Sequence, residues 1–147
     1  MKRFIDAQRK DSGMGADYET ALAEIRAGRK LTHWIWYIFP QIQGLGYSPM
    51  TQKFAIKDID EARQYLNDET LGPRLREIAS ALLAVEGRTA LEILGSPDDM
   101  KVKSCMTLFD YISPNDIFNQ VLLKYYNGSR CTHTIKTLTE QGNQNDK

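Results

Sequence analysis

The sequence predicts an all-α (mainly α) fold, a compact orthogonal multi-helix single domain of about seven or eight short helices. Three observations carry this prediction. Apolar residues recur at the spacing of one helical turn in most segments of the chain. Residues that commonly cap helices precede these segments, and glycines follow several of them. The sustained alternation of apolar and polar residues that is typical of strands is missing.

The first half of the chain shows helical patterns separated by turn residues. A short helix is expected near Phe4, and Asp17 is placed to cap a helix that Gly28 ends. The apolar run 34–39 does not alternate, so periodicity leaves a buried helical turn and a buried strand equally open until Pro40 ends the run. Ser48-Pro49 then indicates another short helix. The apolar face of the following helix consists of Ile59, Ala62 and Leu66.

The second half has the clearer helix signals. Thr70 is a candidate cap for the helix with the stripe Leu71, Leu75, Ile78, Leu82 and Val85. A short helix over 90–94 is expected to end at Gly95. Ser96 is expected to cap the next helix, with Pro97 in its first turn, and Ser113-Pro114 repeats this device. A final helix begins near Thr132. We therefore predict one domain over residues 1–141 and a disordered polar tail over 142–147.

Composition excludes several function classes. Of the 147 residues, 41% are hydrophobic and 26% charged, and Lys+Arg and Asp+Glu both total 19. A net charge of +0 gives no electrostatic reason to bind nucleic acid. No apolar run is long enough to span a membrane, and no signal peptide is evident, so we expect a cytoplasmic protein, a monomer or weak dimer. Two cysteines do not make a disulfide framework, and neither a metal site nor a cofactor is predicted.

Residues 30–48 contain the unusual chemistry of the chain, including both tryptophans and one of the two histidines. His33 is the candidate catalytic residue because a histidine titrates near neutrality. A structural hydrogen-bonding role at the edge of the core is the alternative, and no second catalytic group is fixed by spacing. Trp34 is expected to offer a ring for stacking on a ligand, whereas Trp36 is assigned to the core.

A polar loop follows the aromatic run. The candidate ligand-binding residues there are Gln41, Gly44, Gly46 and Ser48. Glycines let a ligand approach the backbone closely. The loop has no Gly-Lys-Ser/Thr ending, so it is not a phosphate-binding P-loop. Lys101 and Thr107 are also assigned to the ligand site, on the polar side of a helix that also carries Lys103 and Ser104 and faces away from Val102 and Met106. Lys101 would meet an anionic group.

The chain resembles a known bacterial family over nearly its whole length. The most specific part of the resemblance is the segment from His33-Trp34 to Phe39-Pro40-Gln41. Further matching residues are Arg3-Phe4, Ala7-Gln8, Tyr18, Ala21-Leu22, Gly28, Gly44-Leu45-Gly46, Ser48, Ala55-Ile56, Ala62, Tyr65-Leu66, Leu71-Gly72, Arg74-Leu75, Asp99, Lys101 and Met106-Thr107-Leu108-Phe109. This is the uncharacterised family catalogued as domain of unknown function eighteen-ten. Cys105 stands where the family more often has serine.

The resemblance implies a compact helical domain with no established activity. Some members of the family are labelled calpastatin, but calpain-inhibitor repeats are disordered, whereas this chain has capped amphipathic helices. The architecture is also similar to the YbiA-like proteins, which act on N-glycosidic linkages in ADP-ribose-type and riboflavin-pathway metabolites. This analogy implies, for an enzyme, an N-glycosidic hydrolase.

Two functions follow as hypotheses. The first is binding or processing of a small nucleotide or ADP-ribose-like metabolite in a pocket around the His33–Gln41 segment. The second is a non-catalytic protein–protein interaction domain that uses Tyr47 and the exposed part of the same segment. A concave pocket lined by polar groups would favour the first, and a flat aromatic patch the second.

Overall fold

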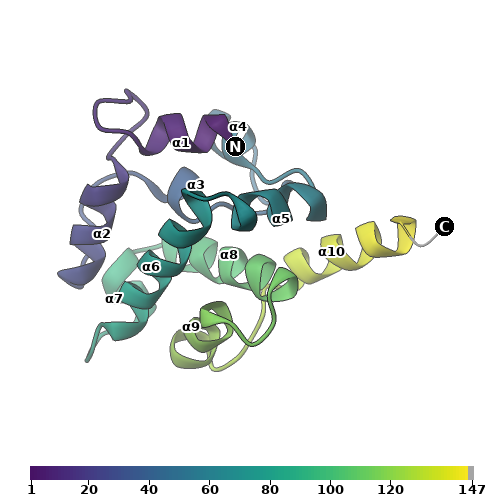
Figure 1. Ribbon diagram of the computed structural model, residues 1–147. Helices are drawn as coiled ribbons and strands as arrows, with labels where there is room; N and C mark the ends of the chain where they lie inside the picture. Colours follow the sequence, from purple (N-terminus) through teal and green to yellow (C-terminus); the bar gives the residue numbers. More distant parts are fainter. Residues whose placement is uncertain (146–147) are drawn as a thin grey trace.

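Ten helices form along residues 1–145, the part of the chain that this computed structural model describes, and they pack as one body (Figure 1). The all-α prediction is confirmed, with more helices than expected. The helices are α1 (Lys2–Gln8), α2 (Tyr18–Arg26), α3 (Ile35–Ile38), α4 (Pro49–Phe54), α5 (Ile59–Asn67), α6 (Leu71–Ala84), α7 (Ala90–Leu94), α8 (Asp98–Ile112), α9 (Ile117–Tyr126) and α10 (Thr132–Asn145). Within residues 1–145 the extended backbone pairs only in one isolated bridge.

Helix α8 lies at the centre of the molecule. It packs against α3, α5, α7, α9 and α10 (Figure 1). Its buried residues lie on nearly every side: Val102, Ser104, Cys105, Met106, Thr107, Leu108, Phe109 and Asp110. The sequence places Ser104 and Thr107 on a polar side of this helix, but both are buried, because α10 and the residues just before it cover that side. Ser104 shares a hydrogen bond of 2.8 Å with Thr134 of α10, so the two small hydroxyls satisfy each other inside the interface.

Helix α6 packs against α2, α5 and α9. Its stripe Leu71, Leu75, Ile78 and Leu82 is buried, as the spacing predicts. Burying each of these side chains stabilises the fold by about 1.5–3 kcal/mol. The apolar periodicity therefore identifies the core face of α6 correctly.

Two helix starts differ from the prediction. Helix α8 begins at Asp98 with Pro97 at the N-cap and no side-chain cap, so Ser96 is not the cap. Asp98 itself stands in the first turn, where a carboxylate stabilises the positive end of the helix dipole. Before α6, Asp68 accepts hydrogen bonds of 2.9 Å from the backbone N–H groups of Thr70 and Leu71, and the Thr70 side chain caps nothing.

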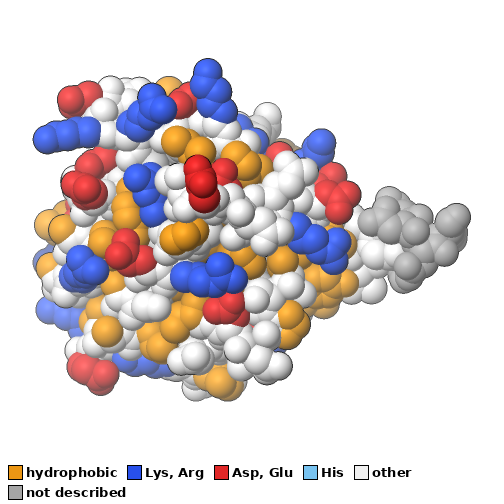
Figure 2. Space-filling model, in the orientation of Figure 1, with side chains coloured by type: hydrophobic (Ala, Val, Ile, Leu, Met, Phe, Trp, Pro, Cys, Tyr) orange, Lys and Arg blue, Asp and Glu red, His pale blue; other side chains and the backbone are white. Residues whose placement is uncertain are grey.

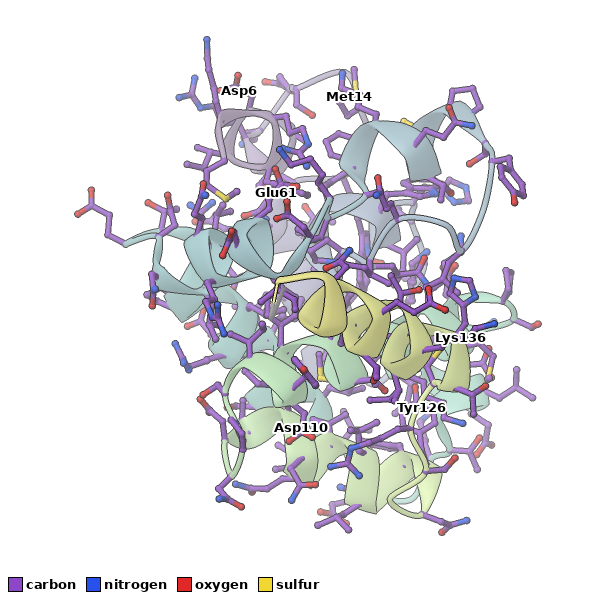
Figure 3. The ribbon with its side chains drawn as sticks, turned by 90° about the vertical axis from the view of Figure 1, so that its right-hand side faces the viewer. Asp6, Met14, Glu61, Asp110, Tyr126 and Lys136 are labelled. Atoms are coloured by element: carbon purple, nitrogen blue, oxygen red, sulfur yellow. The ribbon has the colours of Figure 1, made fainter. Side chains whose placement is uncertain are left out.

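Helix α10 extends to Asn145, into the segment expected to be a tail. Leu138 is buried against the body, and the Gln141 side chain accepts a hydrogen bond from the N–H of Ile59 at the start of α5. Figure 3 shows α10 crossing the molecule with α4 above it and α9 below it. Residues 146–147 of the expected tail lie outside the described part of the chain.

Acidic and basic side chains are interspersed on the face shown in Figure 2, in agreement with the net charge of +0. A patch of one sign would attract nucleic acid or an anionic surface over a distance. Among the described helices, none combines the length and the hydropathy that a membrane span requires.

Candidate functional site

Trp34 is sealed in the core next to a buried carboxylate. Its side chain is 0% exposed, and its indole N–H donates a hydrogen bond of 3.0 Å to Glu24 Oε1. The same carboxylate accepts from the backbone N–H of Leu31 (2.7 Å) and Thr32 (3.0 Å), and from the Thr32 hydroxyl (2.5 Å). Glu24 thus fixes the loop between α2 and α3, and a ligand cannot reach the Trp34 ring in this structure.

The electrostatics of Glu24 match this structural role. Burial by itself would raise the pKa of a carboxyl. Hydrogen bonds from Thr32, Trp34 and Leu31 to the ionised form outweigh that effect, and the pKa of Glu24 lies below its ordinary value. The carboxylate is therefore ionised and fully engaged at neutral pH.

Lys30 closes the other side of this buried cluster. Its ammonium group forms an ion pair of 2.9 Å with Asp98 of α8, donates to the Thr32 carbonyl (2.7 Å) and lies 5.1 Å from the centroid of the Trp34 ring. These contacts tie the loop before α3 to the start of the central helix. We name residues 24–39, with these contacts, the sealed segment.

His33 lies in the sealed segment but its side chain is exposed. Its backbone carbonyl accepts hydrogen bonds from the N–H of Ala16 (3.1 Å) and the hydroxyl of Tyr37 (3.3 Å). His33 lines neither of the two clefts described below. The structure therefore does not bring His33 together with Lys101 or the glycine loop.

The chain after Pro40 forms an open loop that is fixed at its base. Ile42 and Ile56 make a parallel bridge, in which the Gln43 N–H donates to Ile56 O (2.9 Å) and the Ile56 N–H donates to Gln41 O (2.8 Å). We name residues 41–56 the stapled loop; it includes α4. Ser48 Oγ caps α4 by accepting from the N–H of Thr51 (3.2 Å).

A cleft of about 460 Å³ opens between the stapled loop and the N-terminal part of α8. We name it the Lys101 cleft. Its lining consists of Gln41, Leu45, Gly46, Tyr47, Ser48, Thr51, Pro97, Met100, Lys101, Ser104 and Cys131. Lys101 is the one charged residue among these, so the cleft favours a negatively charged guest.

Lys101 keeps its charge available to the cleft. Its ammonium nitrogen lies 5.6 Å from the centroid of the Trp36 ring and 3.8 Å from Asp98 Oδ1. The closer partner of Asp98 is Lys30, at 2.9 Å, so Asp98 does not fully neutralise both lysines. Trp36 is half-buried and borders a small void that also touches Gln41 and Thr51 of the cleft. The tryptophan beside the candidate site is thus Trp36, and Trp34 is the one in the core.

A second cleft of about 630 Å³ adjoins the first. We name it the His133 cleft. Its lining consists of Gln43, Gly44, Gly46, Tyr47, Gln52, Ala55, His133 and Thr137. Gly46 and Tyr47 line both clefts, so the two are separated only by this part of the stapled loop. His133 and Thr137 come from α10, which completes the site from the opposite end of the chain.

The two glycines lie where a side chain would be closely packed against a neighbour. Gly44 has φ +96°, a conformation that L side chains rarely adopt, and a Cβ there would lie 3.3 Å from His133 Nε2. A Cβ on Gly46 would lie 3.0 Å from Thr51 Cγ2. A side chain at Gly44 would therefore crowd His133, and one at Gly46 would crowd Thr51.

The structure groups some of the predicted site residues and disperses others. Gln41, Gly46, Ser48 and Lys101 line the Lys101 cleft, and Gly44 lines the His133 cleft. Thr107 is buried; its hydroxyl donates to Lys103 O (2.8 Å) and accepts from the N–H of Cys131 (3.0 Å). Thr107 thus positions the segment that leads into α10, and it lines neither cleft.

Several site residues were missed by the sequence reasoning. The sequence analysis gives no role to His133, Thr51, Met100 or Cys131. No local pattern marks them, because their position depends on how α10 and the stapled loop pack on α8. Tyr47, proposed for docking, is 84% exposed on the rim of both clefts.

The two thiols differ in accessibility. Burial raises the pKa of the Cys105 thiol, which lies in the core, so Cys105 is a packed and unreactive side chain. Cys131 is partly exposed in the Lys101 cleft. Within the described residues no cluster of three or more His, Cys, Asp or Glu side chains is arranged to hold a metal ion.

A third hollow, of about 660 Å³, lies over α2 and α6 and makes a weaker candidate. Its charges balance: it is lined by Arg26 and Arg74, and by Glu19 and Glu77. Tyr18 donates to Glu77 Oε1 (2.5 Å), and the Arg74 guanidinium lies 5.0 Å from the Tyr18 ring centroid. Two arginines and two glutamates leave the hollow without a net charge to attract a ligand.

Comparisons with known proteins place the chain among uncharacterised relatives. A family model described as "Protein of unknown function (DUF1810)" matches residues 1–138. Among solved structures, the chain is similar to the conserved hypothetical protein Rv1873 from Mycobacterium tuberculosis, with 42% sequence identity and a TM-score of 0.88. The similarity covers 94% of this chain and 95% of that one. Comparison with curated proteins gives no match.

Proposed function

We propose that this chain, which belongs to the DUF1810 family of proteins of unknown function, binds a small anionic metabolite in the Lys101 cleft. The metabolite is of the nucleotide or sugar-phosphate class. The observation that carries this proposal is the single positive charge of Lys101 in a concave site otherwise lined by neutral polar and apolar groups. Clefts of about 300–1,000 Å³ with few convergent polar groups are typical of small-molecule sites, and both clefts fall in that range.

The lining provides contacts for each part of such a ligand. Lys101 supplies the cation for a phosphate or carboxylate from the α8 side of the cleft, and Gln41 supplies a side-chain amide from the side of the stapled loop. Leu45 and Met100 supply apolar surface, and the Tyr47 ring is available for stacking on a flat ring. A nucleotide or ADP-ribose-like metabolite carries both an anionic group and a ring.

The same lining supports binding better than N-glycosidic hydrolysis. Enzymes that cleave glycosidic bonds commonly use a pair of carboxylates, one as acid and one as base or nucleophile. The described residues that line the two clefts provide amides, hydroxyls, a thiol, an amine and an imidazole, but no Asp or Glu. The described lining therefore contains no carboxylate that would stabilise an oxocarbenium-like transition state.

A non-catalytic interaction domain is the second candidate. It is favoured by the exposure of Tyr47 and Met100, 84% and 54%, which both line the Lys101 cleft. Exposed apolar side chains grouped in this way are typical of protein-binding surfaces. Sedimentation over a range of concentrations tests the homotypic form: a weak dimer should become monomeric on Tyr47→Ser.

A matched pair of variants tests the main proposal. A screen of nucleotides and sugar phosphates by thermal shift should find a ligand that raises the Tm of the wild type, because a ligand that binds only the native state stabilises it. Lys101→Met should abolish that shift. Lys103→Met is the control, since Lys103 lies on the same helix but lines neither cleft.

An equal loss of the shift in both variants would mean that only the general charge of α8 matters, and it would contradict a specific site. Absence of any shift across nucleotides and sugar phosphates would contradict the proposed ligand class.

A further inference from the structure

The two clefts differ in chemistry as well as in position. The Lys101 cleft carries a full positive charge beside apolar surface. The lining of the His133 cleft contains no Lys, Arg, Asp or Glu, and its polar side chains are the amides of Gln43 and Gln52, the hydroxyl of Thr137 and the imidazole of His133. An anionic group fits the first cleft, and a neutral ring with hydrogen-bonding edges fits the second.

A ligand that contacts both clefts must cross Gly46 and Tyr47, which line both of them. Gly46 places no side chain in the way, and the ring of Tyr47 is exposed. Gln52 donates a hydrogen bond of 2.8 Å to the Tyr47 carbonyl, which fixes the backbone at Tyr47 and leaves the ring free. A ligand that crosses Gly46 would lie along Tyr47 with one end in each cleft.

We infer that the ligand is a nucleoside phosphate that spans both clefts, with its phosphate at Lys101 and its base in the His133 cleft. This inference rests on the proposed function of the Lys101 cleft and names the ligand class and its orientation. The base stacks on Tyr47, a contact that tolerates every base because each has a π-face. A side-chain amide presents one donor and one acceptor in fixed geometry, which matches the paired donor and acceptor on the edge of a base such as adenine.

Gln43 is the residue best placed to read that edge. Its backbone is held by the Ile42–Ile56 bridge, and its side chain is exposed toward the His133 cleft. Gln52 already uses an amide N–H on Tyr47 O, so it supports the backbone there. His133 stands opposite on α10, and it gives the cleft a second hydrogen-bonding wall.

The experiment compares three probes by calorimetry on the whole chain: AMP, ribose 5-phosphate and adenosine. AMP should bind at least about tenfold more tightly than ribose 5-phosphate, because the base adds stacking and one or two hydrogen bonds. Adenosine, which lacks the phosphate, should bind at least about tenfold more weakly than AMP.

Variants assign these effects to the two clefts. Gln43→Ala and His133→Ala should each weaken AMP about five- to tenfold and leave ribose 5-phosphate unchanged. Lys101→Met should weaken both phosphates. Gln64→Ala and Thr139→Ala are the controls: both side chains are exposed, line neither cleft, and should change no affinity.

The outcomes separate this inference from the proposed function. If both phosphates bind in a Lys101-dependent way and the Gln43 and His133 variants bind AMP normally, the proposed function stands and the spanning ligand is wrong. If AMP and ribose 5-phosphate bind equally well, the base makes no contact and the inference is also wrong. If neither phosphate binds, both proposals fail.

Discussion

The sealed segment (residues 24–39) and the stapled loop (residues 41–56) are neighbours in the sequence and contain similar polar and aromatic side chains, but the fold uses them in opposite ways. In the sealed segment, Glu24 takes up the indole N–H of Trp34 and two backbone N–H groups, and Lys30 is paired with Asp98. In the stapled loop, backbone hydrogen bonds at the base hold the chain while Tyr47 remains exposed.

The difference shows how to tell a structural polar group from a functional one. A buried polar group needs a partner from the protein, because leaving it unpaired costs about 1–3 kcal/mol. Trp34 and Glu24 supply partners for each other and have no capacity left for a ligand. The proposed ligand contacts are instead assigned to groups such as Lys101, whose partly exposed side chain borders a cleft.

The largest expected effect tests the two tryptophans against each other. Trp34→Ala should lower the free energy of unfolding by about 3–5 kcal/mol, because it removes a fully buried ring and its hydrogen bond to Glu24. Trp36→Ala should cost less, about 1–2 kcal/mol, because that ring is half-buried. Urea denaturation measures both. A greater loss for Trp36→Ala would reverse the assignment of the sealed segment.

Glu24→Gln should lower the free energy of unfolding by about 2–4 kcal/mol at pH 7, since the charged acceptor of four hydrogen bonds becomes a neutral amide. Glu19→Gln on the same helix is the control, because Glu19 is exposed and should change stability little.

The pH dependence of the free energy of unfolding is a second test of the role of Glu24. Its pKa in the folded protein lies below the ordinary value of 4.5, so below pH 4.5 the unfolded chain binds more protons than the folded one. The contribution of Glu24 is therefore complete above pH 4.5 and is lost as the pH falls through its folded pKa. The stability difference between wild type and Glu24→Gln should shrink between pH 7 and pH 3; an unchanged difference would show that the ionised form is not the one stabilised.

A smaller effect distinguishes backbone strain from loss of the site. Gly44→Ala and Gly13→Ala place a side chain at φ +96° and +81°, so each should cost about 1–2 kcal/mol. Only Gly44→Ala should also weaken binding of AMP, because its Cβ would contact His133, whereas nothing lies within 4 Å of a Cβ on Gly13. Thermal denaturation with and without AMP measures both effects. Equal binding by the two variants would remove Gly44 from the site.

The smallest effect is expected at His33. His33→Ala should change the free energy of unfolding by no more than about 0.5 kcal/mol and leave AMP binding intact. The exposed imidazole lines neither cleft, and the contacts of this residue with Ala16 and Tyr37 are made by its backbone carbonyl, which the substitution retains. Loss of AMP binding in this variant would restore His33 as the candidate catalytic residue.

The sequence could locate part of the candidate site but not all of it. Gly44, Gly46 and Ser48 stand close together in the chain, so a glycine-loosened polar loop is visible as a local pattern. Lys101 was selected as a cation for an anionic group, and it lines the cleft. His133 was missed because Gly44 and His133 meet only through the packing of α10 on the body.

The amino-acid sequence by itself determined that the protein is helical and which faces of helices such as α6 are buried, because apolar spacing and capping act within a few residues. Only the tertiary structure decided which polar side chains are buried and which line a cleft. Whether Thr107 meets a ligand or the N–H of Cys131, and whether Trp34 or Trp36 borders a cleft, depends on contacts between segments distant in the chain. At such contacts some polar side chains are buried and hydrogen-bonded within the protein, whereas others remain accessible. No local sequence pattern distinguishes the two groups.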